Sequence, residues 1–140
     1  YKERYGYIPI IDFETNATIL PDDDWVEKYR ATFTTSPKLS NNGDPEEKRY
    51  KPEVLKWHVK NGSGFKFVIN EERDLDEVFE KYIHNRDINV PQNRVWLMPC
   101  CGSRQEHTEK AAFVAELCKK HKFNFSPRLQ LVIWDKALKV

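Results

Sequence analysis

Gly64-Phe65-Lys66-Phe67-Val68-Ile69 decides the fold class, because a six-residue run this rich in Phe, Val and Ile favours a strand over a helix. Behind it, apolar residues between Leu75 and Ile83 recur at the spacing of one helix face. A second strand-like run, Arg94–Met98, follows, and then a second helical stripe between Ala111 and Cys118. Strand, helix, strand, helix is the pattern of parallel β/α units.

Working outward, three more runs have the length and composition of strands: Tyr7–Glu14, Ala31–Thr35 and Pro127–Trp134. The sequence therefore predicts an α/β fold of about five mostly parallel strands with two or three helices, in one domain over residues 1–140.

Local signals mark the ends of the helices. Ser103 followed by Glu106 is a capping-box signature for the helix after Met98. A helix is also expected around Asp22–Arg30, and a short one with Pro52 in its first turn at Lys51–Val59. The turn formers and charges of Ser40–Lys51 predict a loop before that short helix.

Composition excludes several functional classes. The 140 residues carry 23 basic and 22 acidic side chains, a formal net charge of +1, which argues against a bulk electrostatic nucleic-acid binder. No run of eighteen apolar residues exists, so the sequence predicts no membrane span. Cys100, Cys101 and Cys118 form no CxxC pair, and the four histidines lack ligand spacing, so no metal site is expected. We expect a cytoplasmic protein with reduced thiols.

Polar residues stand where the expected strands end, which is where chemistry gathers in parallel sheets. Glu14 lies among apolar residues and is expected to have a hydrogen-bonding partner. Ser36-Pro37-Lys38 combines a hydroxyl, a rigid φ and a cation, which can hold a ribose hydroxyl or a carboxylate. Taken alone, Glu14 is better explained as a cap or an ion-pair partner at a strand-to-helix turn, and Ser36-Pro37-Lys38 as a simple turn.

Five segments, taken together, resemble those of the 7-carboxy-7-deazaguanine synthases, in the same order and with the same spacing over essentially the whole chain. They are Glu14–Thr18, Ser36–Ser40, Phe65–Val68 with Asp74-Leu75, Val95–Pro99, and Phe125–Leu129 with Trp134.

The sequence departs from that family in two ways. Ala17 stands where the family usually has Gly, and neither Cys-x-x-x-Cys-x-x-Cys nor Gly-Gly-Glu-Pro occurs in these 140 residues. Both motifs lie N-terminal to the matched region in the family, so the resemblance is to its C-terminal portion. We expect a chain cut from a longer protein, or a trimmed one, that holds no iron–sulfur cluster itself.

The resemblance implies a partial (β/α) barrel of the radical-SAM type. Such enzymes cleave S-adenosylmethionine (SAM) at a 4Fe–4S cluster and, with Mg²⁺, convert 6-carboxy-5,6,7,8-tetrahydropterin to 7-carboxy-7-deazaguanine in queuosine biosynthesis. It also implies that the SAM site is lined by Ser36, Pro37, Lys38, Met98, Pro99 and Cys100. Glu14 and Asn16 would face the same cavity, and the end of the chain at Val140 would approach the pterin substrate. No catalytic residue is assigned.

Two other functional classes stay open. The first is a cluster-less module of the same fold that binds SAM or a nucleoside without radical chemistry. The second is a nucleic-acid or structural interaction domain, in which some of the four tryptophans form a stacking platform, although core packing explains most of them. An incomplete barrel would also expose sheet edges, which favours a homodimer.

Overall fold

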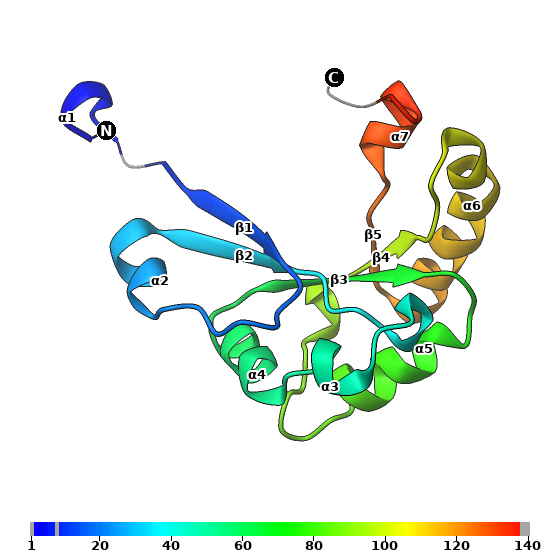
Figure 1. The fold of residues 1–140 in the computed structure, drawn as a ribbon, viewed down its shortest axis with the longest axis horizontal. Coiled ribbons are helices and arrows are strands. Elements are labelled where there is room, and N and C mark those ends of the chain that lie inside the picture. The colour runs from blue at the N-terminus through cyan, green and yellow to red at the C-terminus, as the bar shows by residue number, and fades with distance from the viewer. Residues whose placement is uncertain (1, 8, 138–140) are drawn as a thin grey trace.

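Five strands form one sheet in which every neighbouring pair is parallel (Figure 1). The computed structural model describes residues 2–7 and 9–137. The strands lie side by side in chain order: β1 (Ile11–Thr15), β2 (Ala31–Thr35), β3 (Gly64–Ile69), β4 (Val95–Pro99) and β5 (Asn124–Phe125). Because the order never reverses, the sheet is an arc of a β/α barrel type rather than a doubly wound sheet. The predicted α/β class with five parallel strands is confirmed.

The helices between the strands cover one face of this sheet. The main ones are α4 (Pro52–Lys60), α5 (Asp74–Glu77), the π-helical η2 (Val78–Ile83) that continues it, and α6 (Arg104–His121). Their apolar side chains share a single core with the apolar side chains of β3 and β4. The two helical stripes predicted from the sequence are therefore confirmed, although the first winds as a π-helix after its first turn.

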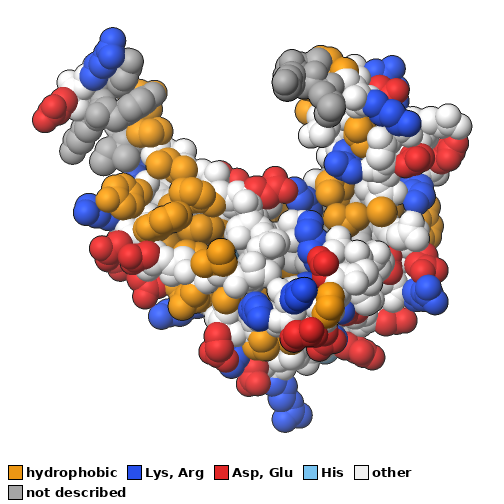
Figure 2. Space-filling model, viewed as in Figure 1, with side chains coloured by type: hydrophobic (Ala, Val, Ile, Leu, Met, Phe, Trp, Pro, Cys, Tyr) orange, Lys and Arg blue, Asp and Glu red, His pale blue; other side chains and the backbone are white. Residues whose placement is uncertain are grey.

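Burial alternates along the strands, so the sheet has a covered face and an open face. On β3 the side chains of Phe65, Phe67 and Ile69 are fully buried against the helices, while Lys66 and Val68 are half-buried on the opposite side. In Figure 2 the molecule is hollowed above this open face, between the arm of β1 and the C-terminal arm. The open face corresponds to the lumen side of a barrel.

Shorter elements complete the chain. They are α1 (Lys2–Tyr5), α2 (Asp24–Tyr29), η1 (Ser40–Asn42), α3 (Glu46–Arg49), η3 (Gln92–Arg94) and α7 (Leu129–Trp134). The expected helices near residues 22–30 and 51–59 are confirmed as α2 and α4. Ser103 caps α6 as expected, because its hydroxyl accepts a hydrogen bond from Glu106 N–H at 3.2 Å, while the Glu106 carboxylate accepts the N–H of Gly102 at 2.7 Å.

The expected closing strand at Pro127–Trp134 is wrong, because residues 129–134 form helix α7. Leu131 N–H donates to Arg128 O at 2.9 Å, and only Leu131 is buried in this helix, where it meets α6. A strand with one covered face would bury alternate residues, but Leu129 and Ile133 are exposed. The fifth strand is instead the two-residue β5.

Two boundaries also differ from expectation. The segment Ser40–Lys51 is not a loop throughout, because it contains η1 and α3. The first strand begins at Ile11 rather than at Tyr7. None of the described helices is long and apolar enough to span a bilayer.

Candidate functional site

A small cavity lies at the carboxyl ends of β2, β3 and β4. It has a volume of about 240 Å³. Its walls come from the turn after β2, from β3 and from the exit of β4, and they consist of Pro37, Lys38, Leu39, Asn41, Asn42, Val68 and Cys100. We refer to it as the strand-end cavity. Three of its residues, Pro37, Lys38 and Cys100, belong to the SAM-binding set expected from the sequence.

The turn that carries Lys38 is fixed on both sides. Ser36 N–H donates to Thr15 O at 2.6 Å, which ties the turn to the end of β1, and Leu39 is inserted into the core with 2% exposure. The Lys38 side chain is half-buried beside the cavity. Its ammonium group has no hydrogen-bond or ion-pair partner among residues 2–7 and 9–137, so the turn presents a cation available to an anionic ligand.

The opposite wall is fixed through Asn41 and Asp74. The Asn41 amide donates to Val68 O at 3.0 Å and to Asp74 Oδ2 at 2.9 Å. The same carboxylate oxygen accepts the N–H groups of Asn70 and Glu71 at 2.7 and 3.1 Å. Asp74 is only 7% exposed, and these three donors supply the hydrogen bonds that a buried carboxylate requires.

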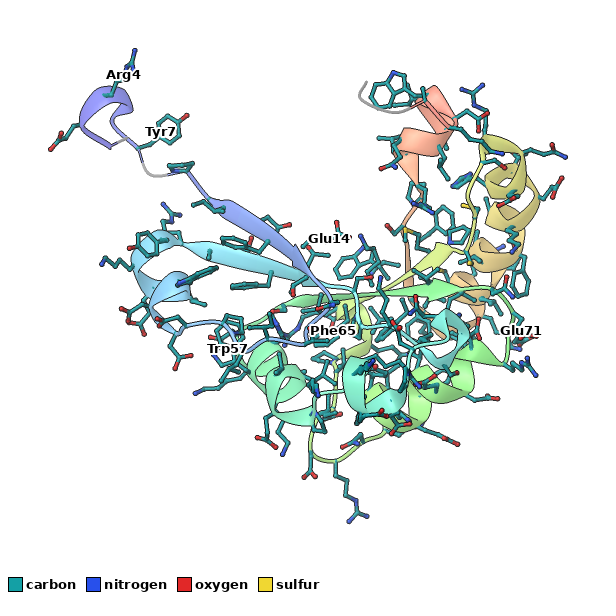
Figure 3. All side chains as sticks on the ribbon, in the orientation of Figure 1. Arg4, Tyr7, Glu14, Trp57, Phe65 and Glu71 are labelled. Carbon is teal, nitrogen blue, oxygen red and sulfur yellow. The ribbon has the colours of Figure 1, made fainter. Side chains whose placement is uncertain are left out.

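On the open face, Glu14 has a partner as expected, although its side chain is exposed and not enclosed by apolar groups. Lys66 Nζ lies 2.5 Å from Glu14 Oε1, and the lysine side chain is 14% exposed against 65% for the glutamate. In Figure 3, Glu14 points into the hollow above the sheet, on the opposite side from Phe65 and Trp57. The pair places a carboxylate and an ammonium group on the lumen side of the arc.

Trp96 forms the floor of a second cavity on the same face. This cavity of about 380 Å³ is also lined by Thr32, Thr34, Lys66 and Ser126. The indole of Trp96 lies against Gly64, where a Cβ atom would come within 3.0 Å of its Cζ3. A side chain at position 64 would therefore crowd the indole, which would have to shift by a few tenths of an ångström.

The remaining expected site residues divide between the two faces. Met98 is half-buried on the open face, in register with the cavity residue Val68. Ser36 is 6% exposed at the β2 exit and is not in the cavity wall. Pro99 is buried on the covered face beside Ile69.

The turn after β1 does not reach the strand-end cavity. The Asn16 side chain is exposed, and its Oδ1 accepts hydrogen bonds from the backbone and hydroxyl of Thr18 at 3.3 and 2.7 Å. Ala17 is fully buried with φ +58°, a left-handed conformation that favours the glycine usual in the family. Val140 lies outside the described residues.

The thiols do not form a metal site. Within the described residues, no three His, Cys, Asp or Glu side chains gather in a way that could hold an ion. Cys101 and Cys118 are buried, their Sγ atoms donate to backbone oxygens, and burial raises the pKa of both. Cys100 is half-buried in the cavity wall. These residues do not fit an iron–sulfur cluster.

Two parts of the site were not identified from the sequence. Lys66 alternates with the buried Phe65 and Phe67, and that alternation alone would have placed it on the open face. No sequence pattern identified Arg49 and Glu77, which hold the Lys38 turn on the side away from the cavity. Arg49 lies in a segment that was expected to be loop.

A parallel arc with helices on one face, an open opposite face and a cavity at its strand ends is the architecture of a portion of a β/α barrel. No protein-family model and no solved structure matches the chain. Two curated proteins do, both named 7-carboxy-7-deazaguanine synthase. The relative from Pyrobaculum aerophilum is 29% identical over 129 residues, which cover 91% of this chain and 53% of the relative.

The relative from Hyperthermus butylicus is 31% identical over 127 residues, which cover 88% of this chain and 52% of that protein. The chain thus spans about half the length of the curated relatives it matches. It resembles a portion of 7-carboxy-7-deazaguanine synthase.

Proposed function

We propose that this chain is the SAM- and substrate-facing part of a radical-SAM enzyme that converts 6-carboxy-5,6,7,8-tetrahydropterin to 7-carboxy-7-deazaguanine. The observation that carries the proposal is the strand-end cavity, where Pro37, Lys38 and Cys100 from two separate strand exits meet around one space. The similarity to two synthases over about nine-tenths of the chain supports the same reaction.

Three polar side chains of the cavity would hold the cofactor, and an ion pair on the open face would contact the substrate. The Lys38 ammonium group would pair with the carboxylate of SAM, because a charge-assisted hydrogen bond is the strongest anchor the cavity offers. Asn41 and Asn42 also line the cavity, but the amide nitrogen of Asn41 already donates to Val68 O and Asp74, so Asn41 would offer the cofactor only its amide oxygen. On the open face, the Glu14–Lys66 pair would meet the polar edge of the pterin.

The radical step would be performed by the cofactor and not by these side chains. SAM at a reduced 4Fe–4S cluster would supply the radical chemistry. The ligands for the cluster would be provided by residues outside this chain, and the reaction also takes Mg²⁺. The residues present here would orient SAM and pterin and keep water from the space between them.

The size of the cavity predicts weak binding by the isolated chain. Its volume of about 240 Å³ lies below the roughly 300–1,000 Å³ of complete ligand pockets. A partial pocket buries less of the ligand and immobilises it with fewer contacts.

Isothermal titration calorimetry with SAM on the 140-residue chain tests the proposal. We expect measurable heat that is lost in Lys38→Ala and retained in Lys119→Ala, an exposed lysine on α6. Equal binding by both variants, or no binding by the unaltered chain, would count against the site.

We also propose that the chain self-associates through the edge of β1. Within the described residues β1 pairs only with β2, and apolar side chains crowd the surface beside this edge (Figure 2), among them Ile10, Ile11, Trp25 and Tyr29. Unpaired parallel strands with apolar surroundings favour association. Analytical ultracentrifugation should show a dimer that Ile11→Lys weakens; an unchanged monomer would exclude it.

A further inference from the structure

The turn that carries Lys38 is held by a buried ion pair behind the strand-end cavity. Arg49, the last residue of α3, is 6% exposed, and its Nη1 lies 2.5 Å from Oε1 of Glu77, the last residue of α5. The Glu77 side chain is 12% exposed. Neither residue is part of the cavity wall.

Both members of the pair hydrogen-bond to the backbone of the turn. Arg49 Nη1 donates to Lys38 O at 3.0 Å, and Arg49 Nε donates to Asp44 O at 3.2 Å. Glu77 Oε2 accepts Ser40 N–H at 2.8 Å. One guanidinium and one carboxylate therefore fix the segment 38–44 at its two ends and near its middle.

The charge of Glu77 is maintained in this position. Burial raises the pKa of its carboxyl group, but the hydrogen bonds from Ser40 and Arg49 outweigh burial, so the pKa lies below its usual value. The carboxylate consequently stays ionised at neutral pH, and the contacts with Ser40 and Arg49 persist.

Net stability is a weak explanation for the pair. Removing two charges from water costs free energy that their attraction only partly returns, and apolar replacements of buried ion pairs are often as stable. Orientation is a better explanation, because the planar guanidinium directs N–H donors on separate nitrogens toward two carbonyl groups and a carboxylate, whereas lysine carries all three of its donors on one rotatable atom.

We infer that Arg49 and Glu77 are positioning residues, which hold the Lys38 turn in the arrangement that accepts the carboxylate of the cofactor. The inference rests on the proposed function for the identity of the ligand. It assigns to the pair neither contact with the ligand nor a part in the chemistry.

Amide hydrogen exchange tests the positioning without any ligand. In Arg49→Lys we expect exchange at residues 38–43 to accelerate at least tenfold, while the amides of β3 and β4 keep their protection. Glu77→Gln, whose amide oxygen can still accept Ser40 N–H, should give a smaller acceleration at the same residues. The matched control is Arg94→Lys, since Arg94 Nη1 also donates to a backbone carbonyl, Val59 O at 3.1 Å, away from the cavity.

Titration of the same variants with SAM tests the consequence. Arg49→Lys should weaken SAM binding at least tenfold, and Arg94→Lys should leave it within twofold. Two results of the exchange experiment on Arg49→Lys would overturn the inference: an unchanged exchange rate at residues 38–43, or a rate that rises equally in β3 and β4. Either would show that Arg49 does not specifically stabilise the turn. Faster exchange with unaltered SAM affinity would overturn it as well. Failure of the unaltered chain to bind SAM would instead refute the proposed function, and the exchange data would still decide the positioning.

Discussion

The two faces of strand β3 differ sharply although they alternate within six residues. Phe65, Phe67 and Ile69 point toward the helices and are fully buried, whereas Lys66 and Val68 point into the hollow and remain half-buried. The covered face consists of apolar side chains that fill the core, whereas the open face carries paired charges and an exposed cavity wall. Substitutions on the covered face should therefore reduce stability, and substitutions on the open face should alter ligand binding.

Shortening a side chain on the covered face should have the largest effect. Phe67 is fully buried and its ring centroid lies 4.7 Å from that of Tyr82. Phe67→Ala should lower the free energy of unfolding by about 3–5 kcal/mol, from lost transfer free energy and a residual cavity. Urea denaturation measures it. The control on the open face, Val68→Ala, should cost about 1 kcal/mol, and equal losses would refute the difference between the faces.

Acid should weaken the covered face through His58. This histidine is fully buried, its Nδ1 lies 2.9 Å from Ser63 Oγ, and burial lowers its pKa from 6.5 to about 4. The unfolded chain takes up the proton near pH 6.5 and the folded chain only near pH 4. Stability should therefore fall as the pH drops through that window, by roughly 3 kcal/mol in all.

Comparison with His58→Gln isolates this contribution, because glutamine does not titrate. The difference between the two proteins in free energy of unfolding should narrow from pH 7 to pH 4. A constant difference over that range would show that His58 is not the group responsible.

Gly64→Ala tests whether the floor of the open face depends on a missing Cβ atom. The added methyl group would meet Trp96 at 3.0 Å and displace the indole, at a cost of roughly 1–3 kcal/mol. Protein labelled with 5-fluorotryptophan gives one fluorine resonance for each of the four tryptophans, and the Trp96→Phe variant identifies that of Trp96. In Gly64→Ala, the Trp96 resonance should shift more than the other three. An unmoved Trp96 resonance would contradict the described packing.

Breaking the Glu14–Lys66 pair should have the smallest effect on stability. Glu14 is largely exposed, so solvent screens the pair and Glu14→Gln should change the free energy of unfolding by less than about 1 kcal/mol. A double-mutant cycle with Lys66→Met measures the coupling. A coupling above 2 kcal/mol would show that the open face contributes to stability as the covered face does.

The covered face was largely predictable from the sequence, and the reason is physical. The boundaries of β2 and β3 follow from compact runs of β-branched and aromatic residues, and the helical stripes follow from their spacing. The error at Leu129–Trp134 has the opposite cause. An apolar run of this length fits a buried strand or a short helix equally well; in the structure it is a helix that contacts α6 and buries only Leu131.

The candidate site was predictable only in part. Lys38 and Cys100 stand at strand exits, and the rule that parallel strands end at the same edge brings them together. Asn16 follows the same rule but uses its side chain within its own turn. The contacts of Arg49 join residues far apart in the chain, and no local pattern encodes them.

Amide chemical shifts recorded during titration with SAM test most directly whether the open side of the strand ends binds the cofactor. We predict that the resonances of Lys38, Asn41, Asn42 and Cys100 move with a common dissociation constant, while those of the helix-facing Phe67 and Leu97 stay in place. Shifts confined to the helix-covered side, or spread evenly over the sheet, would contradict the account.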